Sequence, residues 1–215
     1  MKFLLFVSDR EFSSPVVAFT ELLAKHTGAS VNIHYVCRQM DREAAEASVA
    51  RARQALGDAV DLVRIDEGLA MKKLIEEIER EAYDLVLVGA REERNYLQRK
   101  LSSLSWKVIR ESPIPVLVVR QPREQFRKAL VCTGGLESAE ERIIDGVNLI
   151  REVSAQADLL YVTGMVPSMY TGLDEMDEGL KKMLDSDTPV AANLRRTAEL
   201  LNESGVDGDL LLRQG

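Results

Sequence analysis

The residues with the clearest capacity for chemistry follow a short apolar run near the middle of the chain. Residues 84–88 lead into Gly89, and Arg91 lies two residues further on. A helix is expected at 103–111; it begins at Ser103 and is preceded by Ser102. A glycine lets a ligand approach the backbone closely, and the N–H groups at a helix start attract anions. This pattern predicts a phosphate-binding loop. The alternative, a strand end followed by a capped helix with solvated arginines, is open at this point.

A second glycine-rich turn lies in the C-terminal half. Residues Thr133 to Ser138 read Thr-Gly-Gly-Leu-Glu-Ser, between an expected strand at 129–133 and an expected helix at 137–153. Consecutive glycines in this position expose backbone donors. The turn is similar to the Ser-Gly-Gly-x-Asp-Ser loop of ATP pyrophosphatases, with Thr for Ser and Glu for Asp. The alternative is a tight turn that caps the following helix.

Other chemistries lack their residues. His26 and His34 have no carboxylate at metal-ligand spacing, and no Gly-x-Ser-x-Gly or Cys/His pattern indicates a covalent nucleophile. Cys37 and Cys132 form neither a disulfide framework nor a metal motif, which is typical of a reducing compartment. We therefore expect no metal and no catalytic residues.

Charge and hydropathy exclude further classes. The net charge is −7 and arises in residues 121–215, since acidic and basic residues balance in residues 1–120. Without a long basic stripe, such a chain is a poor general nucleic-acid binder. No apolar run approaches the roughly 18 residues of a membrane span, and the start, MKFLLFVSDREF, lacks the apolar core of a signal peptide. We expect a soluble, cytoplasmic protein without nucleic-acid or membrane partners.

The elements that must position these residues alternate between strand and helix. Buried-strand patterns and amphipathic segments take turns along the first half, and the segment 70–81 places Leu69, Leu74, Ile75 and Ile78 on one side. Such alternation predicts a doubly wound α/β fold with a five-stranded parallel sheet, whose ligands bind beyond the carboxyl ends of the strands. The expected strands are 2–8, 30–37, 61–65, 84–88 and 113–120.

The chain also repeats itself. Residues 2–7 and 31–37 match residues 128–133 and 157–163 without a gap, at an offset of 126 residues. We predict two copies of one α/β unit, at 1–121 and 127–215, of which the second lacks the last two strands. Its half-sheet would leave an apolar edge uncovered. Either the chain is a fragment or a partly lost copy, or another chain or the first domain covers that edge.

The stretch from Tyr83 to Arg120 resembles the universal stress protein family. The resemblance rests on the Asp-Leu-Val-Leu-Val-Gly strand, the Ser-Ser-Leu-Ser-Trp-Lys-Val-Ile-Arg helix and the Pro-Ile-Pro-Val-Leu-Val-Val-Arg ending. It implies a fold like that of the adenine nucleotide alpha hydrolases and a homodimer or an intramolecular pseudo-dimer. In one subgroup of the family it also implies binding of ATP or AMP, with Mg²⁺, through a Gly-x2-Gly-x9-Gly-Ser/Thr loop.

The resemblance transfers to this loop in part. Gly89 matches the first glycine and Ser103 the final Ser/Thr, whereas Glu92 and Ser102 replace the other two glycines. A glutamate adds negative charge beside a phosphate, and a Cβ at Ser102 crowds a backbone donor. Arg91 offsets part of the repulsion. The loop is thus a degenerate form of the family motif.

The resemblance also assigns three residues outside the loop. Asp9, after the first strand, matches the acidic residue that contacts the ribose, with an Asx-type cap as the alternative. The backbone near Val7 and Val36 matches the adenine side. We therefore expect a regulatory stress-response protein that binds nucleotide in its first domain. The alternatives are a dimeric interaction protein without nucleotide and an ATP-pyrophosphatase-type enzyme that uses Thr133–Ser138.

Overall fold

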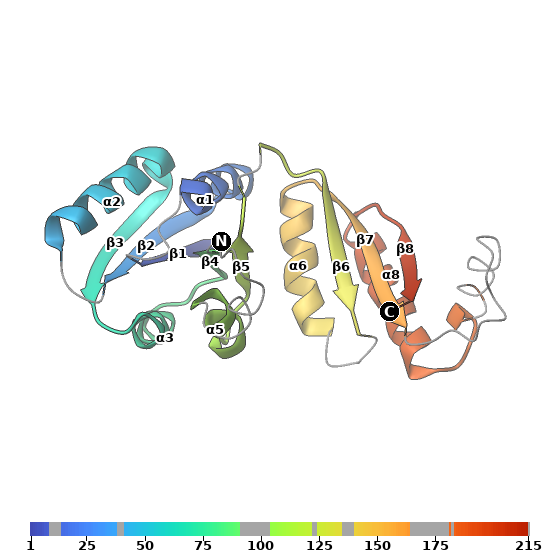
Figure 1. Cartoon of the computed structure of the whole chain (residues 1–215). Helices are drawn as coiled ribbons and strands as arrows, with labels where there is room; N and C mark the ends of the chain where they lie inside the picture. The colour runs from blue at the N-terminus through green and yellow to red at the C-terminus, as the bar shows by residue number, and fades with distance from the viewer. Residues whose placement is uncertain are drawn as a thin grey trace. The chain divides into compact units, whose positions relative to one another are not determined.

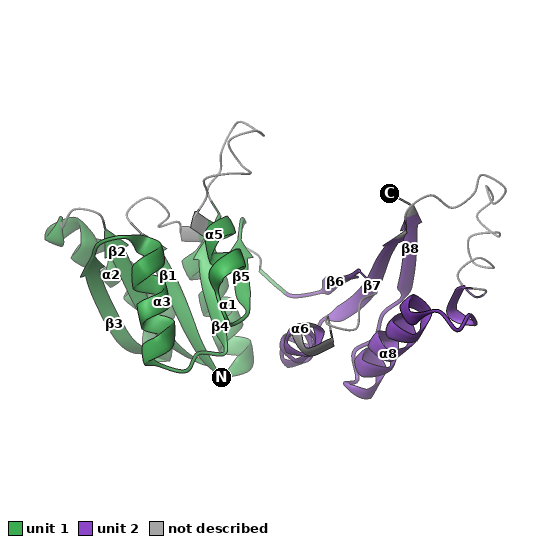
Figure 2. Cartoon of the chain, turned by 90° about the horizontal axis from the view of Figure 1, so that it is seen from below, with its two compact units in different colours: residues 1–125 green, residues 126–215 purple. Residues whose placement is uncertain are grey.

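The chain forms two compact units, Met1–Gln125 and Phe126–Gly215, in the computed structural model (Figure 2). The structure describes residues 1–8, 14–37, 41–90, 104–121, 124–134, 140–163, 181 and 183–214. None of the helices within these residues is long and apolar enough to cross a membrane. Each unit is an α/β body with its own parallel sheet and its own hydrophobic core.

The first unit contains a five-stranded parallel sheet in the order β3-β2-β1-β4-β5. This confirms the predicted fold class. The order places β1 at the centre, and the residues of β1, β2 and β4 are almost all buried, as expected for parallel strands covered on both faces. The elements are β1 (Lys2–Ser8), α1 (Ser14–Thr27), β2 (Ser30–Cys37), α2 (Arg42–Leu56), η1 (Gly57–Ala59), β3 (Val60–Glu67), α3 (Ala70–Arg80), β4 (Leu85–Gly89), α5 (Leu104–Glu111) and β5 (Val116–Val119).

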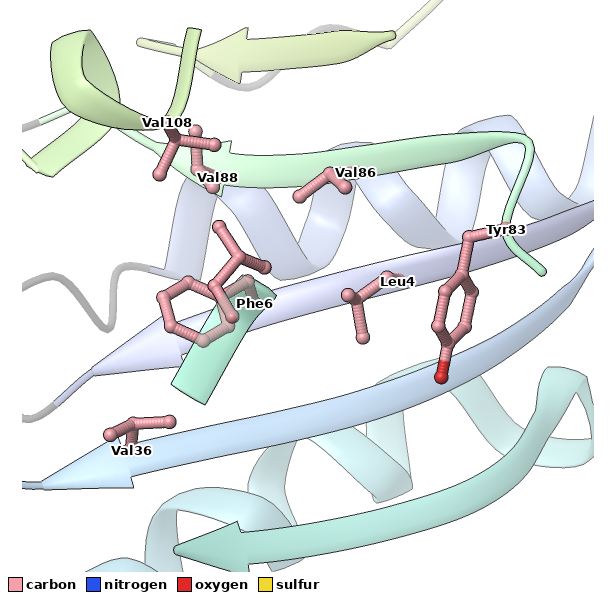
Figure 3. Packing of buried hydrophobic residues seen from close by; sticks show 8 residues of the cluster. Leu4, Phe6, Val36, Tyr83, Val86, Val88 and Val108 are labelled. Atoms are coloured by element: carbon pink, nitrogen blue, oxygen red, sulfur yellow. The ribbon is translucent and has the colours of Figure 1, made fainter. Parts of the chain in front are cut away.

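Helices α1 and α2 cover one face of this sheet, and α3 and α5 cover the other (Figure 1). Under α3 and α5 lies a hydrophobic cluster built from side chains of β1, β2, β4 and the two helices (Figure 3). The alternation of side chains along a strand sends every second residue of β1 to this face. The buried members are Leu4, Phe6, Val36, Leu74, Tyr83, Val86, Val88 and Val108.

The predicted apolar side of α3 was wrong at one position. Leu69 precedes the helix as its N-cap and is 67% exposed, whereas Leu74 is buried as expected. The second buried residue of the helix is Glu77, which is 2% exposed. A carboxylate takes this place because two arginines and a tyrosine hydroxyl surround it, and two of these three groups, Arg64 and Tyr83, lie outside the helix.

Glu77 is the centre of a buried polar cluster between α3 and the sheet. One of its carboxylate oxygens, Oε2, accepts a hydrogen bond from Arg80 at 2.8 Å and lies 3.0 Å from Nε of Arg64. The other, Oε1, accepts a 2.8 Å hydrogen bond from the Tyr83 hydroxyl. The two arginines come from α3 and β3, so this carboxylate connects the helix to the strand below it.

The cluster continues from Tyr83 to the start of the sheet. The amide of Asn32, in β2, donates to the Tyr83 oxygen at 3.0 Å and to Glu81 at 2.8 Å. Glu81 in turn accepts a 2.6 Å bond from the Lys2 ammonium, which lowers the pKa of Glu81 and raises that of Lys2. Burial raises the pKa of Tyr83, so this hydroxyl keeps its proton. The cluster thereby joins α3 to β1, β2 and the lead into β4.

The second unit contains a three-stranded parallel sheet in the order β6-β7-β8. Lys128 pairs with Gln156 as Lys2 pairs with Ser30, so the first two strands of both units have the same register at the 126-residue offset. The tandem repeat itself stays a prediction. The elements are β6 (Lys128–Thr133), α6 (Glu140–Glu152), β7 (Gln156–Thr163), α8 (Pro189–Glu203) and β8 (Leu210–Gln214).

Close approach of two backbones fixes the lead into β8. A Cβ on Gly208 would lie 1.7 Å from the carbonyl oxygen of Ala157, which is far inside van der Waals contact. The neighbouring backbone bonds, from Ala157 to Asp207 and from Leu159 to Asp209, are both 2.8 Å long. The sequence therefore needs glycine here, where β8 begins to pair with β7.

We predict that Tyr83→Phe and Glu77→Gln each lower the free energy of unfolding by about 1 to 3 kcal/mol, because each leaves buried polar partners unsatisfied. In a double-mutant cycle, the double variant should lose less than the sum of the two single losses, since Tyr83→Phe removes the hydrogen bond between the two side chains and Glu77→Gln removes the charge that strengthens it. Urea denaturation at pH 7 measures all four proteins. Additive losses would show that the two side chains act independently.

Candidate functional site

A ligand is expected at the carboxyl ends of the neighbouring strands β1 and β4. The two strands are neighbours, with Phe6 paired to Val88, and they end at Ser8 and Gly89. Beyond β1 the chain leads to α1 on one face of the sheet, and beyond β4 it leads to α5 on the other (Figure 1). Chain segments that diverge to opposite faces leave room at the carboxyl edge, and doubly wound folds bind ligands there.

The structure places three of the predicted site residues. Val7 lies near the end of β1 and Gly89 at the end of β4, one residue beyond the Phe6–Val88 pair. Val36 lies in β2 on the other side of β1, where it pairs with Ser8. Both valine side chains are buried in the core, so they can offer a ligand backbone groups alone. The other four predicted residues, Asp9, Arg91, Ser102 and Ser103, lie outside the described residues, as does Glu92.

The polar groups at the end of β4 already have partners within the protein. The Gly89 carbonyl accepts a 3.0 Å hydrogen bond from the buried hydroxyl of Ser105, and the Ala90 N–H donates to the carbonyl of Val119 at 2.7 Å. These groups hold the first turn of α5 and the strand β5 against β4. Backbone donors for a phosphate must therefore come from residues after Ala90.

Ser105 was not predicted. It stands two residues after Ser103 in a Ser-Ser-Leu-Ser run, where the pattern suggests only caps and phosphate donors. Its hydrogen bond to the Gly89 carbonyl joins residues that are 16 apart in the sequence. Residue patterns within one helix or strand do not predict a contact over this separation. The Ser105 hydroxyl has a positioning role, because its hydrogen bond fixes where α5 begins relative to the end of β4.

A buried histidine, His34, contacts an aspartate near the carboxyl ends of β2 and β3. The ring of His34 is 1% exposed, stands edge-on to Phe6 at 5.5 Å between centroids, and its Nε2 lies 3.0 Å from Oδ2 of Asp66. Burial lowers the pKa of His34, while Asp66 and Glu77 oppose this shift and Arg64 adds to it. A neutral ring here donates from Nε2 to the Asp66 carboxylate. Among the described residues, no group of three His, Cys, Asp or Glu side chains is arranged to hold a metal ion.

The second glycine-rich turn is described at its start. Thr133 ends β6 and is buried, and a Cβ on Gly134 would meet no atom within 4 Å. Packing among the described residues therefore does not require a glycine at position 134. The rest of the turn, from position 135 to 138, lies outside the described residues.

Residues 38–120 match the model of the universal stress protein family. The match covers α2, β3, α3, β4, the loop after Gly89, α5 and β5, and so includes the β4 side of the candidate site. It leaves β1, α1, β2 and the whole second unit outside the matched residues. A search of curated proteins finds no match to the sequence.

Solved structures share the fold. A universal stress protein from Archaeoglobus fulgidus aligns over 99% of this chain and 77% of its own, with a TM-score of 0.64 and 14% identity. A candidate universal stress protein from Pseudomonas aeruginosa aligns over 100% of this chain and 74% of its own, with a TM-score of 0.63 and 17% identity. At these identities the likeness shows the fold alone.

A universal stress protein in complex with cAMP is also similar. It covers 56% of this chain and 97% of its own, with 22% identity and a TM-score of 0.47. A likeness of this degree does not carry its ligand over to this chain.

We predict that His34 makes stability depend on pH between about 7 and 5. Because burial holds the pKa of His34 below 6.5, the unfolded chain takes up this proton at a higher pH than the folded chain. The free energy of unfolding should thus fall as the pH falls through this range, and less so in His34→Gln. Urea denaturation at several pH values measures the slope. His26→Gln, which changes an exposed histidine, should keep the wild-type slope, and equal slopes in all three proteins would contradict the prediction.

Proposed function

We propose that the chain is a regulatory protein of the universal stress type whose first unit binds an adenine nucleotide, ATP or AMP with Mg²⁺. One observation carries this proposal: the loop that resembles the family's phosphate loop starts at Gly89. Gly89 lies at the carboxyl edge of the sheet, where the segments that follow β1 and β4 lead to opposite faces. The family match over residues 38–120 includes that loop. The expected position of a ligand in the fold and the loop of matching residue types thus coincide.

In this proposal each predicted residue has a separate task. Asp9 follows β1 and accepts hydrogen bonds from the ribose, while the backbone near Val7 and Val36 borders the adenine. Gly89 keeps the strand end free of a Cβ, and Ser102 and Ser103 donate to phosphate oxygens at the start of α5. Arg91 compensates for the negative charge of Glu92.

Ser105 supports the same proposal through position. Its hydroxyl fixes the first turn of α5 against the Gly89 carbonyl, so that the start of α5 has a defined place relative to the edge. Donors that are held before the ligand arrives bind it at a lower entropic cost. The proposed role is sensing, and we expect at most weak ATP hydrolysis.

Titration calorimetry of the purified chain with ATP and AMP in Mg²⁺, together with mass spectrometry of co-purified ligands, tests the proposal. We expect micromolar binding that Asp9→Ala weakens at least about tenfold, which corresponds to about 1.4 kcal/mol. Gly89→Val should also weaken binding, because its side chain would fill the edge. Asp58→Ala is the matched control, since Asp58 lies in η1 before β3, at the opposite edge of the sheet.

A pair of serine variants tests whether the start of α5 belongs to the site. Ser105→Ala and Ser112→Ala remove similar hydroxyl-to-carbonyl hydrogen bonds, of 3.0 and 2.8 Å, at the two ends of α5. Both should cost about 1 kcal/mol of stability. Ser105→Ala alone should weaken nucleotide binding, and equal affinities in the two variants would place the site elsewhere.

A lack of both heat and ligand would favour the second candidate, an interaction protein without nucleotide. The exposed apolar side chains of Leu130 and Val162 in the second unit support that candidate. An enzyme of the pyrophosphatase type would instead release pyrophosphate, and this activity would persist in Asp9→Ala and be lost in Gly134→Val.

A further inference from the structure

Three buried polar atoms on the α3 side of the first sheet make no hydrogen bond with any described residue. They are Oδ1 of Asn32, Nδ1 of His34 and Nε of Arg64. Asn32 and His34 alternate in β2, so their side chains leave the same face of the sheet, and Arg64 of β3 is paired in register with His34. This is the face that α3 covers, because Arg64 contacts Glu77 there. Buried polar atoms are nearly always hydrogen-bonded, so three in one place point to a missing partner.

The contacts of Asn32 determine which of its two polar atoms is without a partner. The amide nitrogen donates to Glu81 at 2.8 Å and to the Tyr83 oxygen at 3.0 Å. Lys2 lowers the pKa of Glu81, and an ionised carboxylate can only accept, so the group that faces it must be the NH₂. The remaining atom, Oδ1, is therefore an acceptor. Asn32 is buried, so this oxygen lies away from bulk solvent.

The contact with Asp66 fixes the role of the second atom in the same way. Nε2 of His34 lies 3.0 Å from the Asp66 carboxylate, so in the neutral ring Nε2 carries the proton and Nδ1 has a lone pair. Burial lowers the pKa of His34, which favours this neutral ring. From β1, the side chain that meets the ring is the edge-on Phe6, which is apolar. Nδ1 is therefore a buried acceptor.

The third atom has the opposite character. Nε of Arg64 carries a hydrogen and can only donate. It lies 3.0 Å from Oε2 of Glu77, close enough for an ion pair, but the direction of its N–H does not form a hydrogen bond with that oxygen. Oε2 already accepts a hydrogen bond from Arg80 at 2.8 Å. The three atoms together thus present two acceptors and one donor.

This combination of acceptors and donor selects the kind of ligand. A metal ion would suit the Asn32 oxygen and the His34 nitrogen, but it would lie against the positive guanidinium of Arg64. An anion would suit Arg64 and be repelled by the two acceptors, and an ammonium ion has no lone pair for the Arg64 N–H. A water molecule donates two hydrogen bonds and accepts others, so it can satisfy all three atoms at once.

We propose that Asn32, His34 and Arg64 form a binding site for one internal water molecule. The water donates to Oδ1 of Asn32 and to Nδ1 of His34, and it accepts from the Nε–H of Arg64. It is a built-in part of the first unit, in the way that buried waters commonly are, and the site does not depend on nucleotide.

The water would also join two groups of polar contacts. Asn32 belongs to the cluster around Glu77 through its bond to the Tyr83 hydroxyl, whereas His34 is bonded to Asp66 near the carboxyl edge of the sheet. A water between Asn32 and His34 makes these contacts one hydrogen-bonded chain beneath α3. The chain then connects the lead into β4 with the carboxyl end of β3.

A crystal structure of the purified chain, at a resolution that shows ordered water, tests the proposal. We expect one water within about 2.7 to 3.2 Å of all three atoms. A dry site, a water that reaches only one or two of the atoms, or an ion in its place would each overturn the proposal.

NMR of the histidine rings tests the site in solution. At pH 7 the Nδ1 atom of His34 should have the nitrogen-15 shift of an unprotonated nitrogen, and the ring should give a nuclear Overhauser cross-peak with a slowly exchanging water. The exposed ring of His26 should contact only rapidly exchanging water. A proton on Nδ1 of neutral His34 would overturn the proposal, because that atom would then be a donor. A His34 ring without a water cross-peak would overturn it as well.

Two variants separate the water from the rest of the polar cluster. Asn32→Leu and Tyr83→Phe both break the contact between the two side chains, but only Asn32→Leu removes Oδ1 and fills its place with an apolar group. We expect the cross-peak between water and His34 to disappear in Asn32→Leu and to persist in Tyr83→Phe, with circular dichroism showing that both are folded. A cross-peak that persists in both or is lost from both would contradict the proposal. If Asn32→Leu does not fold, the wild-type crystal structure and spectrum decide.

Discussion

A parallel sheet must bury both of its faces, and this constraint governs each unit of the chain. In the first unit the helices divide between the faces, with α1 and α2 on one and α3 and α5 on the other. The chain can cover both faces only by sending α1 and α5 in opposite directions from the neighbouring strands β1 and β4. The edge at Gly89 is a direct result of this division. The candidate site therefore follows from how the sheet is covered.

The contact surface between α3 and the sheet is partly polar, and its polar contacts fix the position of the helix. Leu74 packs on the sheet through non-directional apolar contact, whereas Glu77 meets Arg64 and Tyr83 at positions that its hydrogen bond and ion pair require. Buried ion pairs contribute little net stability, but misplacing one leaves charged groups without partners. We infer that the cluster selects the register of α3. The helix start at Ala70 then follows the end of β3 at Glu67, near the carboxyl edge of the sheet.

The sequence predicts the sheet well because buried parallel strands are continuous apolar runs that local patterns report. It does not predict Glu77, whose partners come from β3 and from Tyr83, or the exposure of Leu69, which sits before the first turn of α3. Ser105 was missed for the same reason, since its partner is 16 residues away. For the site, sequence reasoning located the edge and Gly89, while the roles of the predicted ligand contacts stay predictions. The spacing of residues within one segment does not show which residues of other segments they contact.

The second sheet shows that residue type and exposure give different information. Leu4 and Leu130 stand at equivalent positions of matching strands, yet one is buried and the other is 54% exposed. A single exposed leucine is common on protein surfaces and needs no explanation. Leu130, Leu160, Val162 and Leu211 are a different case, because they lie on one face of three adjacent strands whose other face packs against α6 and α8.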